Sequence, residues 1–327
     1  MLVTEAQPVV KNPVNQKREI TVAQDGSGDF MTIQAAINAV RDLGQWRVKI
    51  FIKAGIYKEK LVIPSWKTKI SLIGADKQHT IITNSDYSGK ANPGGKDAFG
   101  SDRFSTFTSY TVLVQGDDFI AENLTIENSA GRVGQAVALH VEGNRSIIRN
   151  CRLLGNQDTL YAATAGSRQY YQNCYIQGTT DFIFGEATAV FQDCTIKSLS
   201  NSYVTAAATS DRQPFGFVLI NCNLIAESGV DKVYLGRPWR PYARTVYLNC
   251  VLGSHIVPEG WNPWKGDAMF TDKEKTAYYA EYGNSGSGAS TINRVSWSKQ
   301  LSAKEAKRYT LKNILGGIEN WSPLTAP

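Results

Sequence analysis

An internal repeat around the five cysteines constrains the fold of this chain more than any other feature. Each cysteine follows a short β-rich segment with alternating apolar positions, and an Asn or Asp directly precedes it, as in IIRNCRL, YYQNCYI, VFQDCTI, VLINCNL and VYLNCVL. FIAENLTI fits the same pattern with a leucine in place of the cysteine. The repeated positions are Leu124, Cys151, Cys174, Cys194, Cys222 and Cys250, separated by 27, 23, 20, 28 and 28 residues. Units of this length and pattern are typical of the coils of a parallel β-helix.

Other repeat architectures fit this sequence less well. Leucine-rich repeats have similar periods, but their L-x-x-L-x-L pattern is missing here, and propeller blades need about 40 residues per unit. We therefore predict an all-β fold, a single-domain right-handed parallel β-helix that spans residues 18–322. Residues 1–17 are expected to form a loosely ordered N-terminal extension, and residues 323–327 a C-terminal tail.

Two helices are expected to bracket the solenoid, because a stack of repeats needs cover at its ends. The segment TIQAAINAVRDLG ends at Gly44 and places these apolar residues on one face: Ile33, Ala36, Ile37, Val40 and Leu43. Near the other end, Ser302 and Glu305 read as a capping box that opens a helix running toward Leu315. The segments 85–103 and 283–291, rich in Gly and Ser, are predicted to be surface loops.

Two aspartates occupy equivalent places in successive repeats. Asp158 lies seven residues after Cys151, and Asp181 lies seven residues after Cys174. On successive coils their Cα atoms would lie about 5 Å apart. Two carboxylates this close cannot both ionise freely, so one is pushed toward its protonated form while the other stays an anion. The pattern indicates a nucleophile and an acid; a pair of turn aspartates without a catalytic role is the alternative.

Two glutamines and an arginine extend this candidate site. Gln157 directly precedes Asp158, and Gln135 lies 22 residues earlier, about one coil away. Stacked carboxamides can donate N–H groups to an oxyanion, or they can form a ladder that only stabilises the stack. Arg237 is harder to place by counting; its guanidinium would hold Asp181 ionised if it reached it, and a surface salt bridge is the alternative.

Charge and composition exclude several other function classes. The net charge of +6 suits a polyanionic partner. No run of Lys and Arg is longer than two residues, and no nucleic-acid-binding signature occurs. No apolar run approaches the roughly 20 residues of a membrane span. The cysteines form no C-x-x-C pair, which argues against a zinc or redox site.

Several longer motifs occur in order along residues 18–322: VAQDGSGDFMTIQAAINA, FIKAGIYKEKLVI, GQAVALHVEG, NQDTLYA, GTTDFIFGEATAVFQDC, YLGRPWRPYARTVYLNC and EGWNPW. On these motifs the chain resembles the pectin methylesterases, the pectinesterase family of plants and their microbial and animal counterparts. The motif sequences DFIFG and QAVAL are more similar to those of the plant-type enzymes than to those of the divergent enterobacterial enzymes.

The resemblance implies hydrolysis of the C6 methyl esters of homogalacturonan, the polymer of pectin, to pectate and methanol. Asp181 of DFIFG would attack the ester carbonyl, and Asp158 of QDT would act first as general acid and then as general base. Gln135 and Gln157 would stabilise the oxyanion, and Arg237 would orient Asp181. The aromatic residues implied to line the sugar subsites are Trp239, Trp261, Phe184 and Tyr161.

The resemblance has further implications. Cys174 and Cys194 stand where the plant enzymes have a cysteine pair, so a disulfide is predicted between them. The protein is expected to be a secreted monomer of the extracellular space or cell wall, with its leader missing from this sequence. Its expected partners are pectin and a proteinaceous pectinesterase inhibitor, without nucleic acid or membrane. No metal or organic cofactor is implied.

Two alternative functions stay open. Carboxylates about 5 Å apart also fit a retaining glycosidase, and β-helices host polysaccharide depolymerases such as polygalacturonases and pectate lyases. The two glutamines favour an oxyanion over an oxocarbenium ion, and a calcium-dependent lyase would need more clustered acidic ligands. The other alternative is a diverged relative, either a carbohydrate-binding solenoid without catalysis or a thioesterase.

Overall fold

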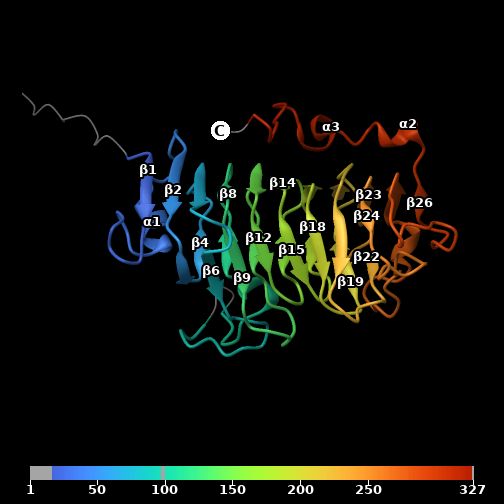
Figure 1. Cartoon of the computed structure of the whole chain (residues 1–327), viewed down its shortest axis with the longest axis horizontal. Coiled ribbons are helices and arrows are strands. Elements are labelled where there is room, and N and C mark those ends of the chain that lie inside the picture. Colours follow the sequence, from blue (N-terminus) through green and yellow to red (C-terminus); the bar gives the residue numbers. More distant parts are fainter. Residues whose placement is uncertain (1–16, 97–99, 326–327) are drawn as a thin grey trace, which may run out of the picture.

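The chain winds into three parallel sheets that run side by side along the molecule (Figure 1). The structure is a computed structural model that describes residues 17–96 and 100–325. Its sheets contain 11, 8 and 7 strands, and successive strands of one sheet belong to successive coils. This arrangement is the predicted right-handed parallel β-helix. The N-terminal extension predicted over residues 1–17 lies, apart from Lys17, outside the described residues.

The strands of each sheet follow in spatial order. The 11-stranded sheet consists of β1 (Glu19–Val22), β2 (Val48–Ile52), β5 (Ile70–Gly74), β8 (Ile120–Glu122), β11 (Ser146–Arg149), β14 (Arg168–Gln172), β17 (Thr188–Gln192), β20 (Phe217–Ile220), β23 (Arg244–Leu248), β25 (Tyr278–Tyr282) and β26 (Lys299–Gln300). The 8-stranded sheet consists of β3 (Gly55–Lys58), β6 (Thr80–Asn84), β9 (Thr125–Asn128), β12 (Arg152–Leu154), β15 (Tyr175–Gly178), β18 (Thr195–Ser198), β21 (Asn223–Ala226) and β24 (Val251–Leu252). The 7-stranded sheet consists of β4 (Leu61–Ile63), β7 (Val112–Val114), β10 (Leu139–Val141), β13 (Leu160–Ala162), β16 (Ile183–Gly185), β19 (Tyr203–Ala207) and β22 (Tyr234–Pro238).

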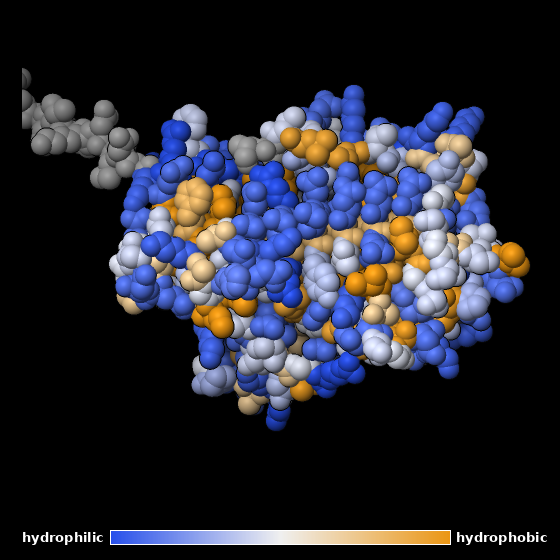
Figure 2. All heavy atoms as spheres, in the orientation of Figure 1, coloured by the Kyte–Doolittle hydropathy of each residue, from blue (hydrophilic) through white to orange (hydrophobic). Residues whose placement is uncertain are grey.

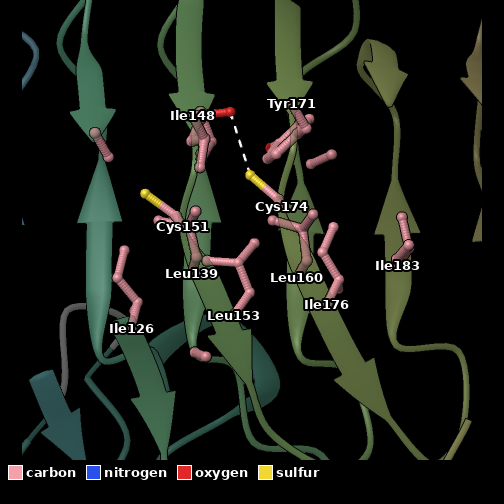
Figure 3. Packing of buried hydrophobic residues seen from close by; sticks show 14 of the residues in the cluster. Ile126, Leu139, Ile148, Cys151, Leu153, Leu160, Tyr171, Cys174, Ile176 and Ile183 are labelled. Atoms are coloured by element: carbon pink, nitrogen blue, oxygen red, sulfur yellow. Dashed lines mark hydrogen bonds between the residues drawn. The ribbon is translucent and has the colours of Figure 1, made fainter. Parts of the chain in front are cut away.

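The register of the 8-stranded sheet confirms that the repeated positions stack. Each strand from β9 to β24 in this sheet begins directly after one of them, and neighbouring strands pair first residue to first residue. All the repeated side chains are buried. Figure 3 shows Cys151 and Cys174 in the interior beside Leu153 and Ile176. The repeat is therefore a column of side chains in the core of the solenoid.

The Asn or Asp before each repeated position makes the turn between two sheets. These residues have φ angles between 51° and 59°, a left-handed conformation that Asn and Asp adopt more readily than other residues with a side chain. Their side chains also bond from coil to coil: Asn150 Nδ2 donates to Asn123 Oδ1 at 3.0 Å, and Asn173 Nδ2 donates to Asn150 Oδ1 at 3.2 Å. The left-handed turn and this ladder of hydrogen bonds explain why an Asn or Asp recurs before each repeated position.

The predicted disulfide between Cys174 and Cys194 is wrong, because all five cysteines are free thiols. Four of the five thiols lie against a backbone carbonyl of the preceding coil, and the fifth, Cys151, donates to Arg149 O of its own coil at 3.3 Å. Cys174 Sγ donates to Ile148 O at 3.4 Å (Figure 3), and Cys194 Sγ donates to Tyr171 O at 3.5 Å. Burial raises the pKa of the Cys194 thiol well above its usual value, which keeps it protonated and unreactive.

We expect a reductant to leave the thermal stability of this protein unchanged. A disulfide that closed the 20-residue loop from Cys174 to Cys194 would contribute about 3 kcal/mol, and its reduction would lower Tm. Melting curves with and without a phosphine should therefore coincide, and alkylation of the unreduced, denatured chain should modify all five cysteines. A lower Tm after reduction together with only three alkylated thiols would contradict the structure.

A short helix covers the first coil, as predicted. Helix α1 (Ile33–Ala39) lies at the N-terminal end of the solenoid beside β1 and β2 and buries its apolar face against the core (Figure 1). It is shorter than the sequence pattern predicted. It ends at Ala39, because Val40 is already extended, and Leu43, with a φ of 50°, is 71% exposed instead of extending the apolar face.

The C-terminal helix is two short helices, α2 (Ala303–Ala306) and α3 (Leu311–Leu315). The predicted capping box is present: Ser302 Oγ accepts from Glu305 N at 3.3 Å, and the Glu305 carboxylate accepts from Ser302 N at 2.7 Å. The expectation that this segment covers the last coil is wrong. Both helices lie along the outside of the 11-stranded sheet (Figure 1), where Ile314 and Leu315 cover an apolar stripe that includes Tyr170.

The face of the molecule seen in Figure 2 carries both hydrophilic and hydrophobic side chains. Hydrophilic side chains predominate over β12, β15 and β18 in the middle of the view of Figure 2. The described parts of 85–103 and 283–291 contain no helix or strand, as predicted. Two 3-10 helices, η1 (Thr106–Thr108) and η2 (Lys273–Lys275), lie outside the coils. No helix in the described ranges is long and apolar enough to cross a membrane.

Candidate active site

The two aspartates lie on successive coils, in the turns that lead into the 7-stranded sheet. Asp158 precedes β13 by two residues and Asp181 precedes β16 by two residues, and the first residues of these strands pair. Both aspartates have positive φ angles, 64° and 48°, and both are buried, at 8% and 6% exposure. Strained, buried carboxylates at one point of a fold are typical of functional sites.

Arg237 pairs with one aspartate only. Its Nε donates to Asp181 Oδ1 at 2.9 Å and its Nη2 donates to Asp181 Oδ2 at 2.6 Å, a bidentate ion pair. Arg237 lies on β22, two strands away from β16 in the 7-stranded sheet. The strand between them places Ala206 beside both Arg237 and Phe184, so only a methyl group separates the arginine from the coil of Asp181.

Two aromatic rings hold the guanidinium in place. Its central carbon lies 3.5 Å from the ring centroid of Trp264 and 3.9 Å from that of Tyr203. Stacking between aromatic faces suits the planar, weakly hydrated guanidinium and restricts its rotation. The direction of the Arg237 fork toward Asp181 is therefore fixed before any substrate binds.

These surroundings separate the two carboxyl groups electrostatically. Burial raises the pKa of Asp158 well above its usual value, and the negative charge of Asp181 raises it further. Burial also raises the pKa of Asp181, but the hydrogen bonds and charge of Arg237, and the charge of Lys273, act in the opposite direction. In the described ranges, no cation forms an ion pair with Asp158. Asp158 is therefore the group that keeps a proton, and Asp181 is the anion.

Gln135 and Gln157 line the same cavity of about 330 Å³ as the two aspartates. They form an isolated parallel bridge, so they stack on neighbouring coils as the spacing predicted. Within the described chain, no hydrogen bond occupies either side-chain amide. Their N–H groups are thus available to a bound oxygen atom.

Three of the four predicted aromatic residues form one cluster beside the dyad. Phe184 stacks on Tyr161 with ring centroids 4.5 Å apart, and Trp239 meets the edges of both rings. Phe184 and Trp239 line the cavity that holds the aspartates, while Tyr161 lines the space next to it. The cluster therefore places aromatic side chains along the wall of the cavity beside the dyad.

The fourth predicted residue, Trp261, does not reach the cavity. It is fully buried and packs between Tyr247 and Tyr279, with ring centroids 5.6 and 4.5 Å away. Its Nε1 donates to Glu281 Oε1 at 3.3 Å. The prediction that Trp261 contacts sugar is wrong, because the backbone bridge between Trp261 and Gly236 turns the indole into the core.

Alanine substitutions should show that Trp261 contributes to stability and Trp239 to substrate binding. Trp261→Ala is expected to lower the free energy of unfolding by about 3–5 kcal/mol, because it leaves a large cavity in the core. Trp239→Ala is expected to raise KM with a much smaller loss of stability. Urea unfolding curves and steady-state kinetics of both variants test this, and a raised KM with full stability in Trp261→Ala would contradict its buried position.

The site also contains residues outside the set of site residues predicted from the sequence. Phe107 and Thr106 of η1 line the cavity, and Trp264 lines it while stacking on Arg237. No motif or spacing relates η1 to the dyad, since it follows the irregular segment 85–103. Trp264 follows Trp261 by three residues in EGWNPW, and the sequence could not indicate which indole faces outward.

Two observations limit other kinds of site. In the part of the chain that the structure describes, no three His, Cys, Asp or Glu side chains are grouped as metal ligands. Another hollow, of about 550 Å³, lies at the start of the 11-stranded sheet near Trp46 and Arg47, far along the chain from the dyad. Half of its lining residues are basic, and neither aspartate of the dyad lines it.

Comparisons with known proteins show the family of the chain. The family model described as Pectinesterase matches residues 19–318. The chain is 38% identical to Pectinesterase QRT1 of Arabidopsis thaliana over 320 residues, which is 95% of this chain and 80% of that protein. It spans about half the length of several other curated Arabidopsis relatives that it matches.

Solved structures are similar over nearly the whole chain. Pectin methylesterase from carrot superimposes with a TM-score of 0.82 at 36% identity, covering 94% of this chain and 95% of the carrot protein. A pectin methylesterase in complex with a hexasaccharide superimposes with a TM-score of 0.79 at 30% identity, covering 94% and 98% of the two chains.

Proposed function

The chain belongs to the pectinesterase family of carboxylic ester hydrolases, and we propose that Asp181 and Asp158 carry out its hydrolysis of pectin methyl esters. The observation that carries the assignment of roles is the asymmetry of the dyad. Asp181 is held as an anion by two hydrogen bonds from Arg237, while Asp158 is buried next to it without a cation. One group can therefore attack and the other can donate a proton.

In the first half of the reaction, an Asp181 carboxylate oxygen forms a bond to the C6 carbonyl carbon of a galacturonate methyl ester. The carbonyl oxygen becomes an oxyanion, which accepts hydrogen bonds from the side-chain amides of Gln135 and Gln157. The bond from C6 to the methoxy oxygen then breaks. Asp158 gives its proton to that oxygen, so methanol leaves, and the galacturonyl group stays on Asp181 as an acyl-enzyme.

In the second half, Asp158 is a carboxylate and accepts a proton from a water molecule. The oxygen of that water attacks the C6 carbonyl carbon, again with the oxyanion at the two glutamines. The bond to Asp181 breaks, which releases a galacturonate carboxyl group and restores the Asp181 anion and the protonated Asp158. Arg237 stays on Asp181 in both halves, so it acts as a positioning residue that also keeps the nucleophile ionised.

The partners and location of the protein follow from this proposal. We propose methyl-esterified homogalacturonan as the substrate, supported by the aromatic cluster of Tyr161, Phe184 and Trp239 beside the dyad. Pectin lies in the cell wall, so the proposal also places the protein outside the cell. An interaction with a proteinaceous pectinesterase inhibitor and a monomeric state stay predictions based on the family resemblance.

Methanol release and chain length, measured on the same pectin samples, test the reaction against its rivals. The esterase reaction should release methanol from highly methylated pectin while the length of the polymer stays constant. A depolymerase would shorten the chain, and a carbohydrate-binding protein without catalysis would do neither. Activity on acyl thioesters with none on pectin would favour the thioesterase alternative.

A further inference from the structure

A second cavity of about 460 Å³ continues the catalytic cavity, and Phe107 lines both of them. One wall of this second cavity is formed by His140 of β10 and Tyr161 of β13, which pair with each other across the 7-stranded sheet. The ring of Tyr161 lies 4.4 Å from the ring of His140 and 4.5 Å from that of Phe184, which lines the catalytic cavity. The two cavities are therefore parts of one cleft, connected by an aromatic column.

Two glutamates face the second cavity from coils that are two steps apart. Glu142 directly follows β10 and Glu186 directly follows β16, while Ala163 takes the equivalent place after β13 between them. All three residues line the cavity. At the spacing of successive coils, the glutamates lie roughly 10 Å apart along the sheet. The short side chain of Ala163 leaves the space between them open.

Three buried polar atoms in this cavity, two of His140 and one of Glu186, lack a hydrogen-bond partner within the described chain. His140 is only 4% exposed, and both of its ring nitrogens are buried without a hydrogen bond. Its Nε2 lies 3.2 Å from Glu142 Oε1, which forms an ion pair with the ring when His140 is protonated. Glu186 Oε1 accepts from the Tyr161 hydroxyl at 3.3 Å, while Oε2 is buried and unpaired. Buried polar atoms without partners are costly, so they point to a ligand that brings hydroxyl groups.

The charge of the cavity defines which sugar fits. Among the described residues that line it, none is a lysine or an arginine, and its charged groups are Glu142, Glu186 and, when protonated, His140. His140 and Gln115 lower the pKa of Glu142, and Gln115 Nε2 donates to its Oε2 at 2.9 Å. Burial raises the pKa of Glu186. With Glu186 ionised, the lining is net negative whether or not His140 carries a proton.

We propose that this cavity is a subsite that accepts a methyl-esterified galacturonate unit and rejects a free galacturonate, with Glu142 and Glu186 as the specificity-determining residues. The inference rests on the proposed function. A methyl ester carries no charge, and its methyl group can contact Phe107 and Leu113, which also line the cavity. A free carboxylate would lie between two glutamates in a site partly shielded from water, where like charges repel strongly.

Carboxylate-to-amide variants test this subsite without changing its shape. The variants are Glu142→Gln, Glu186→Gln and the double substitution, and the probe is a fully de-esterified oligogalacturonate used as a competitive inhibitor of methanol release at low ionic strength. We expect the double variant to bind the inhibitor about tenfold more tightly than the wild type, since one removed like-charge contact is commonly worth that much.

Two controls separate charge in the cavity from charge elsewhere. Glu227→Gln makes the same change on the 8-stranded sheet beside Lys197, and it should leave the inhibition constant unchanged. Added salt should weaken the discrimination in the wild type and have less effect in the double variant. Calorimetric titration with the same oligogalacturonate measures its affinity independently of turnover.

The outcomes are distinct. Equal affinity of wild type and double variant for the oligogalacturonate would overturn the subsite proposal while leaving the esterase mechanism intact. A wild-type protein that releases no methanol from fully methylated pectin would overturn the proposed function itself, whatever the affinities.

Discussion

Asp181→Asn is expected to lower kcat for methanol release by at least about 10⁴-fold, the scale seen when a catalytic nucleophile is removed. Asparagine has nearly the same shape and tolerates the left-handed backbone at this position, where φ is 48°. Its amide cannot attack the ester as a carboxylate does, so the acyl-enzyme cannot form. Methanol measured from highly methylated pectin, with protein concentration and circular dichroism matched to the wild type, gives the result.

The matched control for this variant is Asp193→Asn. Asp193 also has a left-handed backbone, with a φ of 55°, and it lies in the turn where other coils already carry asparagine. It is exposed and far from the cavity, so its activity should equal that of the wild type. A large loss of activity in Asp193→Asn would mean that an Asp-to-Asn substitution in such a turn impairs the fold itself. Near-normal activity of Asp181→Asn would rule out Asp181 as the nucleophile.

Asp158→Asn is expected to lower kcat by about 10²- to 10⁴-fold, the usual contribution of a positioned general acid and base. Asparagine cannot donate a proton to the departing methoxy oxygen or accept one from water. The substrate should still bind, because the aromatic cluster and the cavity are unchanged. The loss should therefore appear in kcat with KM nearly constant.

The pH profile of the same variant gives a second readout. The wild type needs Asp158 protonated and Asp181 ionised, so kcat/KM should fall as pH rises through the raised pKa of Asp158 and fall as pH drops through that of Asp181. In Asp158→Asn the limb at high pH should disappear, since the group that titrates there is gone. A high-pH limb that persists unchanged would assign it to a different residue.

The fold was predictable because the repeat carries its own register. One residue before each cysteine, an Asn or Asp makes the left-handed turn that ends a strand, and this local requirement is visible in the sequence. Counting from the cysteines then placed Asp158 and Asp181 on neighbouring coils, and the register of β13 and β16 confirms it. The bridge between Gln135 and Gln157 was found in the same way.

The features of the site and fold that were not predictable from the sequence depend on contacts between residues far apart in the chain. Arg237 reaches Asp181 only because Ala206 lies between them on β19, a fact that no spacing along the chain encodes. Trp261 and Trp264 are only three residues apart. The turn between them places Trp261 in the core and Trp264 against the guanidinium of Arg237. The C-terminal helices follow an apolar stripe on the 11-stranded sheet, which only becomes continuous once the coils are stacked.

Carboxyl carbon NMR of the protein with ¹³C-labelled aspartate measures the electrostatic asymmetry of the dyad. We predict one carboxyl resonance, absent from Asp158→Asn, that stays at its protonated position well above the ordinary aspartate pKa of about 3.9, while the resonance absent from Asp181→Asn is already that of the anion. If the resonance of Asp158 is ionised at a pH where that of Asp181 still carries its proton, the assignment of acid and nucleophile is reversed and the account is contradicted.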